Sequence, residues 1–110
     1  MRLFLYRYDP SVGRKRWSDA GDPGEVTDGG LSARRVAGRT ILLSRVAGEI
    51  CAFDGECPHR GAPLERGRLE DGVIHCSMHG YAFDIRSGKG VGNDHQLETL
   101  KVVVAEEPPA

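Results

Sequence analysis

The stretch ECPHRGAPLERGRLEDGVIHCSMHGYAFD, residues 56–84, concentrates the side chains of this chain that can bind a metal. It holds two of the three cysteines and three of the four histidines of the 110 residues. Two close pairs stand out, Cys57 with His59 and Cys76 with His79, and sixteen residues separate His59 from Cys76. Each pair can offer a thiolate and an imidazole from one loop, a ligand set that suits zinc or a mixed-ligand iron–sulfur cluster.

The segment between the two pairs is predicted to be a hairpin that brings them together. Gly67–Glu70 and Val73–Cys76 flank the dipeptide Asp71-Gly72, which is typical of tight hairpin turns. Gly61 and Gly80 supply the sharp turns that a metal-binding loop needs. We therefore expect both pairs to contribute to one site.

The rest of the chain shows short β-rich runs closed by small turns, and no helical periodicity of useful length. Thr40–Val46 and Glu49–Phe53 predict a hairpin, Tyr81–Ile85 predicts a strand that ends at a Ser87-Gly88 turn, and Leu97–Ala105 predicts a closing strand. Fifteen glycines and six prolines suit a fold with many tight turns. The predicted fold class is all-β, a small antiparallel sandwich or barrel.

The first thirty residues are less regular. Arg2–Tyr8 is consistent with a strand, whereas Asp9–Gly30 is rich in Gly, Asp and Pro and predicts a loop of about twenty residues. Trp17, the only tryptophan, is expected to pin this loop to the core. The last residues, 106–110, are expected to be a frayed tail.

Composition excludes several function classes. Fifteen basic and 16 acidic residues leave a net charge of −1, which favours neither nucleic acid nor an anionic membrane as a partner. The longest early apolar run, Leu3–Leu5, is too short for a signal peptide or a membrane span. An odd number of cysteines argues against a disulfide framework, so we expect a cytoplasmic location.

The mixture of Cys and His within each loop helps to distinguish zinc from an iron–sulfur cluster. Zinc fingers usually place two ligands of one type in each knuckle, whereas each loop here carries one Cys and one His. Mixed loops suit a two-iron cluster in which one iron receives both thiolates and the other both imidazoles. The spacing, with the flanking CPHRGAPL and CSMHGYAFDIRSGK, resembles the Rieske family, in particular Rieske ferredoxins and the Rieske domains of ring-hydroxylating oxygenases. The resemblance covers roughly Leu31–Val104.

This resemblance implies a single Rieske domain over residues 1–110, with an N-terminal strand and long loop in 1–30 and a cluster-binding region in 54–88 formed by two loops. It implies one 2Fe–2S cluster per chain, with Cys57 and Cys76 on the inner iron and His59 and His79 on the outer iron. The implied role is that of an electron carrier rather than an enzyme. Its partners would be an NAD(P)H-dependent flavoprotein reductase and a terminal oxygenase or similar oxidoreductase.

The resemblance also implies the low-potential branch of the family. Respiratory members carry an extra Cys in each loop, at positions that match Ala62 and Met78 here. They also place a Ser and a Tyr at the positions of Tyr81 and Phe83, and the hydroxyl groups of these residues donate hydrogen bonds that stabilise the reduced cluster. This chain lacks both of those donors, so a low reduction potential is expected here. Many members have a proline-rich third loop, but residues 88–100 contain no proline.

Two alternatives stay open at this point. The first is a small subunit or accessory Rieske domain of a nitrite-reductase-like enzyme. The second is a zinc-stabilised β-domain that uses the same four residues and binds a protein partner. Among the other candidate residues, His75 is expected to point away from Cys76, Cys51 to be a core thiol, and His95 to be a surface or capping residue rather than a proton or partner contact.

Overall fold

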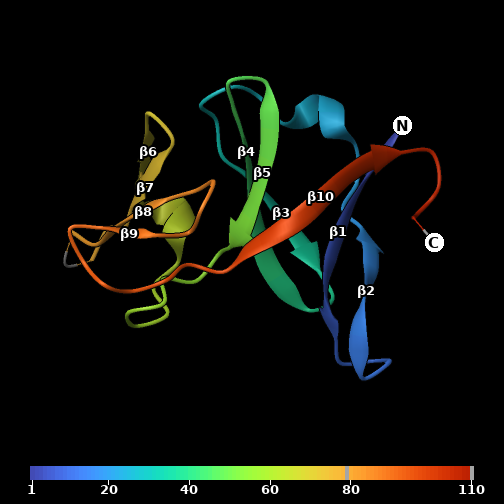
Figure 1. Ribbon diagram of the computed structural model, residues 1–110, viewed down its shortest axis with the longest axis horizontal. Coiled ribbons are helices and arrows are strands. Elements are labelled where there is room, and N and C mark those ends of the chain that lie inside the picture. Colours follow the sequence, from blue (N-terminus) through green and yellow to red (C-terminus); the bar gives the residue numbers. More distant parts are fainter. Residues whose placement is uncertain (79, 110) are drawn as a thin grey trace.

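The computed structural model describes residues 1–78 and 80–109. Within them, ten strands form two antiparallel sheets, and two short 3-10 helices lie in the connections between strands (Figure 1). The larger sheet has the order β2-β1-β10-β5-β4-β3, with β1 Arg2–Asp9, β2 Arg14–Asp19, β3 Ser32–Val36, β4 Arg39–Val46, β5 Glu49–Asp54 and β10 Thr99–Ala105. The smaller sheet has the order β6-β7-β8-β9, with β6 Arg68–Glu70, β7 Val73–His75, β8 Ala82–Asp84 and β9 Gly90–Val91. The 3-10 helices are η1 Pro23–Glu25 and η2 Leu64–Arg66.

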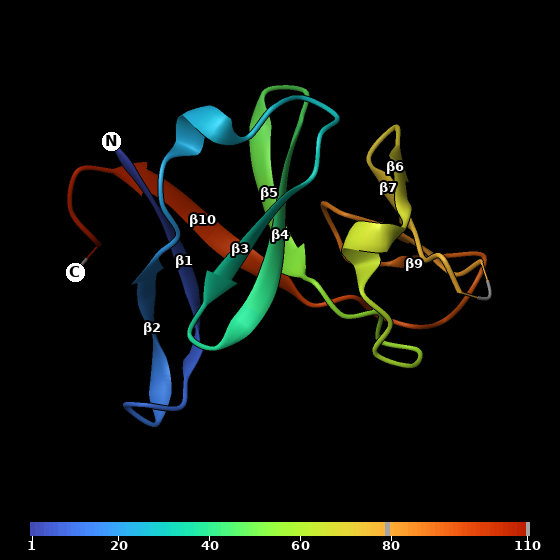
Figure 2. The same cartoon turned by 180° about the vertical axis from the view of Figure 1, so that it is seen from behind.

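The larger sheet curls around a core of its own (Figure 2). Successive side chains of a strand point to opposite faces, so Leu3 and Leu5 of β1 face the same side as Ile41 and Leu43 of β4. These four side chains are fully buried and pack in one cluster with Ala52 of β5. The predicted all-β fold, a small antiparallel sandwich or barrel, is confirmed.

Strands β4 and β5 carry a second core on their other face. Leu42 and Phe53 are register partners, and both are fully buried against the smaller sheet. Ile74 of β7 and Phe83 of β8 complete this contact. A strand that is buried on both faces shows a continuous apolar run rather than alternation, which explains the ILL sequence of β4. The same contact holds the smaller sheet, and the candidate site within it, against the larger one.

The two hairpins with the clearest turn signals form as predicted. Ala47 and Gly48 connect β4 to β5 with φ of 51° and 84°, and Asp71 and Gly72 connect β6 to β7 with φ of 50° and 76°. Two successive residues with positive φ are the mark of the type I′ turn, whose twist matches that of paired strands. The second of these hairpins spans the interval between the two ligand pairs.

The expectation of one long loop after β1 is wrong for Arg14–Asp19, which forms β2 and pairs with β1. Asp9 organises the turn between them: its Oδ1 accepts hydrogen bonds from the Ser11 N–H at 2.9 Å and the Ser11 hydroxyl at 2.7 Å, and its carbonyl accepts the Gly13 N–H at 2.9 Å. β2 is a largely exposed edge strand, so its polar sequence shows no apolar alternation.

Trp17 belongs to this edge strand and not to a loop. Its ring lies 5.1 Å from that of Tyr6, its register partner on β1, and it is a member of neither buried cluster. It therefore packs on the outer face of the sheet instead of pinning a loop to the core. The tail returns to the same face, where Pro108 and Pro109 line a shallow hollow with Tyr6 and Trp17.

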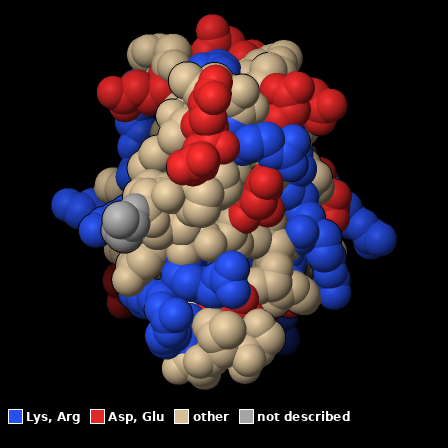
Figure 3. Space-filling view, turned by 90° about the vertical axis from the view of Figure 1, so that its right-hand side faces the viewer, with Lys and Arg blue, Asp and Glu red and all other residues tan. Residues whose placement is uncertain are grey.

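This end of the molecule carries charges of both signs (Figure 3). Lys and Arg side chains flank an area without charge, and acidic side chains lie above it. The mixture agrees with the small net charge of the chain. Of the helices that the structure describes, none has the length and hydrophobicity to span a membrane.

Asp9 gives the β1–β2 hairpin a pH dependence. The hydrogen bonds from Ser11 hold the pKa of the carboxyl below its ordinary value of 3.8. A group whose pKa is lowered by folding stabilises the protein above its unfolded pKa, and this stabilisation is lost as the pH falls through the folded pKa. We expect Asp9→Asn to lower the free energy of urea unfolding at neutral pH and the difference from wild type to narrow below about pH 4. A difference that stays constant with pH would contradict this role.

Candidate metal centre

The two ligand loops are built alike. The first opens at Cys57, whose N–H donates to the Ala62 carbonyl at 2.8 Å. The second opens at Cys76, whose N–H donates to the Tyr81 carbonyl at 2.7 Å. In each six-residue loop the fifth residue is a glycine with positive φ, a conformation that other residues adopt only at a cost. The chain thus presents the two cysteines in equivalent positions.

Packing brings the two loops together. Cys57 and Cys76 are 2% and 5% exposed, and both belong to the buried cluster that contains Phe53 and Phe83. The first loop is tied to the end of β5 by a hydrogen bond from the Leu64 N–H to the Gly55 carbonyl at 2.8 Å. The second loop connects β7 to β8. The apolar surroundings exclude water from both thiols.

The environment of Cys57 suits a thiolate bound to a cation. Burial is the main cause that raises the pKa of its thiol, and the neighbouring Cys76 thiol acts in the same direction. The backbone N–H groups of His59 and Arg60 donate toward the sulfur and lower the pKa. Without a cation, burial favours the neutral thiol; with one, the two amides stabilise the thiolate.

His59 lies farther out than the cysteines and is partly exposed. Its ring stacks on that of Tyr81, with centroids 4.1 Å apart, and Tyr81 closes the loop that Cys76 opens. The structure therefore brings Cys57, His59 and Cys76 to one end of the molecule. The fourth predicted ligand, His79, lies outside the described residues.

The donor set fits a two-iron cluster. A zinc ion needs four ligands around one point, whereas each iron of a Rieske cluster takes only two protein ligands. Paired buried thiols with an imidazole set farther out match the second arrangement.

Comparison with known proteins agrees with this geometry. Residues 16–103 match the family model of the Rieske [2Fe-2S] domain. The chain belongs to the Rieske [2Fe-2S] family. The predicted Rieske fold, 2Fe–2S cofactor and electron-transfer role are thereby confirmed, and the family match favours the iron–sulfur cluster over zinc.

Several Rieske proteins resemble this chain over most of their length. The ferredoxin component of an alkene monooxygenase system of Xanthobacter autotrophicus is 35% identical over 93 residues, 76% of each chain. The ferredoxin component of the naphthalene 1,2-dioxygenase/salicylate 5-hydroxylase systems of a Ralstonia species is 35% identical over 77 residues, 70% of this chain and 74% of that protein. A ferredoxin of Sphingomonas yanoikuyae B1 has a similar structure, with a TM-score of 0.68, 26% identity and coverage of 77% of this chain and 86% of the other.

Cys51 and His75 lie where the sequence placed them. Cys51 is buried and unpaired, as expected of a core thiol, and burial raises its pKa. His75 follows the fully buried Ile74 on β7, so its side chain points away from the face shared by Ile74 and Cys76.

Sequence reasoning gave His95 as a surface or capping residue and did not predict that it lies beside His59. It is partly buried, and its ring centroid lies 5.4 Å from that of His59 and 5.1 Å from that of Tyr81. No spacing pattern links residue 95 to residue 59, so the only signal in the sequence was an isolated histidine beyond the second loop.

The expected low potential can be tested at Phe83. This side chain is fully buried in the cluster that contains both cysteines. A hydroxyl added by Phe83→Tyr would be a donor close to the sulfur atoms, and donors stabilise the reduced, more negative state. We expect a higher reduction potential in protein-film voltammetry. Phe53→Tyr, in the same buried cluster but on β5, serves as the control for adding a hydroxyl to the core. Equal shifts of the reduction potential in both variants would contradict a hydrogen bond from the hydroxyl added at position 83 to the cluster or its sulfur ligands.

Proposed function

We propose that this protein carries single electrons from an NAD(P)H-dependent flavoprotein reductase to a terminal oxygenase or a similar oxidoreductase. We further propose that Cys57 and Cys76 hold the inner iron of the cluster and that His59 and His79 hold the outer iron. The observation that carries the proposal is the pair of equivalent loops, with two thiols buried side by side and His59 at the exposed end.

The bound cluster supplies one reversible electron. The residues of the chain create its setting. Phe53 and Phe83 keep water from the thiolates, and the amides of His59 and Arg60 stabilise the Cys57 sulfur as an anion. His59 is partly exposed, so it offers a short path between the site and a docked partner.

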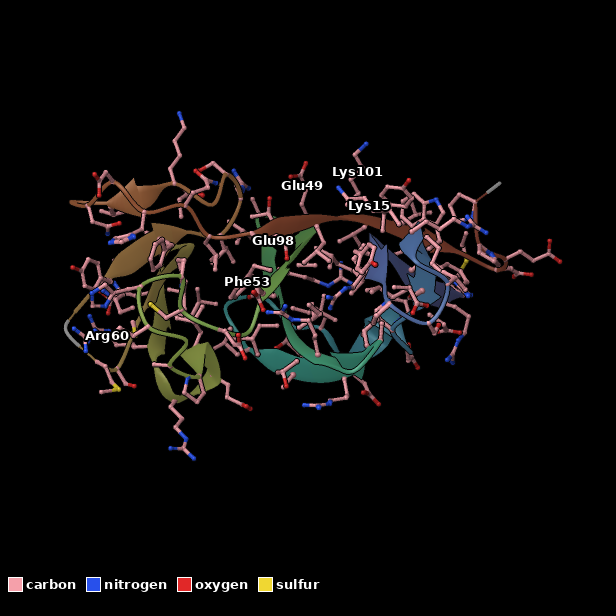
Figure 4. The ribbon with its side chains drawn as sticks, turned by 90° about the horizontal axis from the view of Figure 1, so that it is seen from below. Lys15, Glu49, Phe53, Arg60, Glu98 and Lys101 are labelled. Atoms are coloured by element: carbon pink, nitrogen blue, oxygen red, sulfur yellow. The ribbon has the colours of Figure 1, made fainter. Side chains whose placement is uncertain are left out.

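The exposed end of the site is the expected docking face. Arg60, in the first loop, lies at one end of the molecule, whereas Lys15 and Lys101 lie nearer its middle (Figure 4). Met78, in the second loop, is 52% exposed and adds an apolar side chain to this face. A small face with an exposed apolar residue suits a transient redox partner, which must bind and leave quickly.

Similar proteins support an oxygenase as the acceptor. One solved structure is a complex of reduced oxygenase and oxidized ferredoxin in carbazole 1,9a-dioxygenase; the matched chain has a TM-score of 0.67 and 27% identity, and the match covers 77% of this chain and 82% of that one. The relatives above are ferredoxin components of a monooxygenase and a dioxygenase system. We infer a cytoplasmic location. We also infer one domain over residues 1–110, in which residues 54–88 bind the cluster and the segment from β9 to His95 lies beside them.

The first test is an EPR spectrum of dithionite-reduced protein purified without oxygen, with iron and zinc counted in the same sample. A rhombic signal with two irons per chain is expected for the mixed-ligand cluster. A silent spectrum with one zinc per chain would overturn the electron-carrier proposal and favour a structural zinc domain.

A further inference from the structure

Three rings from distant parts of the chain meet at the outer end of the site. Tyr81 lies over His59 with the ring planes tilted by 33° and the centroids 4.1 Å apart. The plane of His95 is steeply inclined to both rings, at 68° to His59 and 86° to Tyr81, as in a T-shaped pair. Each ring therefore contacts the other two, and the three form a closed group, which we call the ring cluster.

The ring cluster limits the motion of His59. Stacked and edge-to-face contacts at these distances are attractive arrangements for aromatic rings. Rotation of the His59 side chain would break its contacts with both Tyr81 and His95. The imidazole of His59 is thus held between contacts with two other rings.

The backbone around His95 is itself fixed. The His95 N–H donates to the Asn93 side-chain oxygen at 3.0 Å, and the His95 carbonyl accepts the Gly90 N–H at 3.1 Å. The Asn93 side-chain amide donates to the Ala82 carbonyl of β8 at 3.1 Å. Since Ala82 directly follows Tyr81, Asn93 ties His95 to the strand that also places Tyr81.

On the other side, Leu97 fixes the segment in the core. Leu97 is 1% exposed, and its N–H donates to the Gly88 carbonyl at 2.8 Å. Gln96 adds a hydrogen bond from its side-chain amide to the Ser87 carbonyl at 2.9 Å. The segment that carries His95 is therefore anchored two residues before and two residues after the ring.

We propose that His95 is a positioning residue for the cluster: together with Tyr81 it holds the imidazole of His59 in one orientation, and Asn93 sets the position of His95. The inference rests on the proposed function, because it takes His59 as an iron ligand. Residues that orient a ligand change how tightly a metal is held and how it is tuned, even though they do not touch it.

The test uses the full chain, purified without oxygen with its cluster, in four variants. His95→Ala removes the ring, His95→Phe keeps an aromatic ring without the imidazole nitrogens, and Asn93→Ala removes the anchor. Val91→Ala is the control, because Val91 lies on the same segment, is 52% exposed and has no part in the ring cluster. The readouts are the rate of cluster release to an iron chelator, followed by visible absorption, and the EPR line width of the reduced protein.

We expect His95→Ala to release the cluster at least about fivefold faster, the lower limit for the loss of two aromatic contacts, and to broaden the EPR lines as His59 samples several orientations. His95→Phe should restore both properties, Asn93→Ala should shift them in the direction of His95→Ala, and Val91→Ala should match wild type. If His95→Ala does not fold, as judged by circular dichroism, the release rates and line widths of Asn93→Ala and His95→Phe test the inference instead.

Wild-type behaviour in His95→Ala, or equal losses in His95→Ala and His95→Phe, would overturn the inference. These results leave the wild-type cluster intact, so they do not affect the proposed function. Absence of the cluster from the wild-type protein would overturn both the proposed function and this inference. The spectrum of the wild-type protein would show this before any variant is compared.

Discussion

Cys57→Ala is expected to abolish the visible spectrum and the iron content of the protein. The remaining buried thiol, Cys76, cannot complete the site, and metal binding is coupled to the folding of its loops. The expected result is a colourless chain after purification without oxygen, measured by absorption and iron analysis. Cys76→Ala is expected to give the same result, because the two loops are equivalent.

Cys51→Ala is the matched control for this experiment. Cys51 is also a buried, unpaired thiol in the same core cluster, but it lies on β5 and outside both loops. Its replacement should cost roughly 1 kcal/mol of stability and leave the cluster bound. An intact spectrum in Cys57→Ala, or loss of the cluster in Cys51→Ala, would refute the assignment of the thiolate ligands.

Gly67→Ala is expected to destabilise the small sheet strongly, because the added methyl group has no space. Gly67 precedes β6 with φ of −85°, which any residue adopts, so the obstacle is space. A Cβ at this position would overlap the His75 carbonyl oxygen of β7. Backbone atoms cannot yield as a side chain can, so we expect a loss of about 3 kcal/mol in urea unfolding and a lower cluster content.

The control for this prediction is Gly38→Ala. Gly38 has φ of +79° but open space around its Cα, so only backbone strain of about 1 kcal/mol is expected, with the cluster retained. The comparison separates lack of space from backbone conformation. Equal losses of stability in the two variants would show that β6 and β7 move apart at little cost, contrary to the packing described above.

Local signals in the sequence predicted most of the site. The Cys-x-His and Cys-x-x-His pairs, the glycines that follow each histidine and the turn between β6 and β7 are all set by neighbours in the chain. Such features follow from the steric requirements of a few adjacent residues. For this reason the ligand loops and the hairpin turns were predictable before the structure was known.

The errors concern one hairpin whose second strand lacks the usual sequence pattern. Arg14–Asp19 has no strand-like alternation, and it is a strand because β1 offers it an edge and Asp9 turns the chain toward that edge. Trp17 packs on Tyr6 because pairing of β1 with β2 makes them neighbours. Neither contact leaves a pattern in the sequence around it.

The sequence by itself determined the types of the proposed ligands, their grouping into two loops and the all-β class, because these depend on residue chemistry and on short-range turns. Only the tertiary structure decided that Cys57 and Cys76 are buried in one core cluster with Phe53 and Phe83 and that His95 lies against His59. Those contacts join residues from different loops, and they form because the apolar faces of the two sheets must be buried against each other.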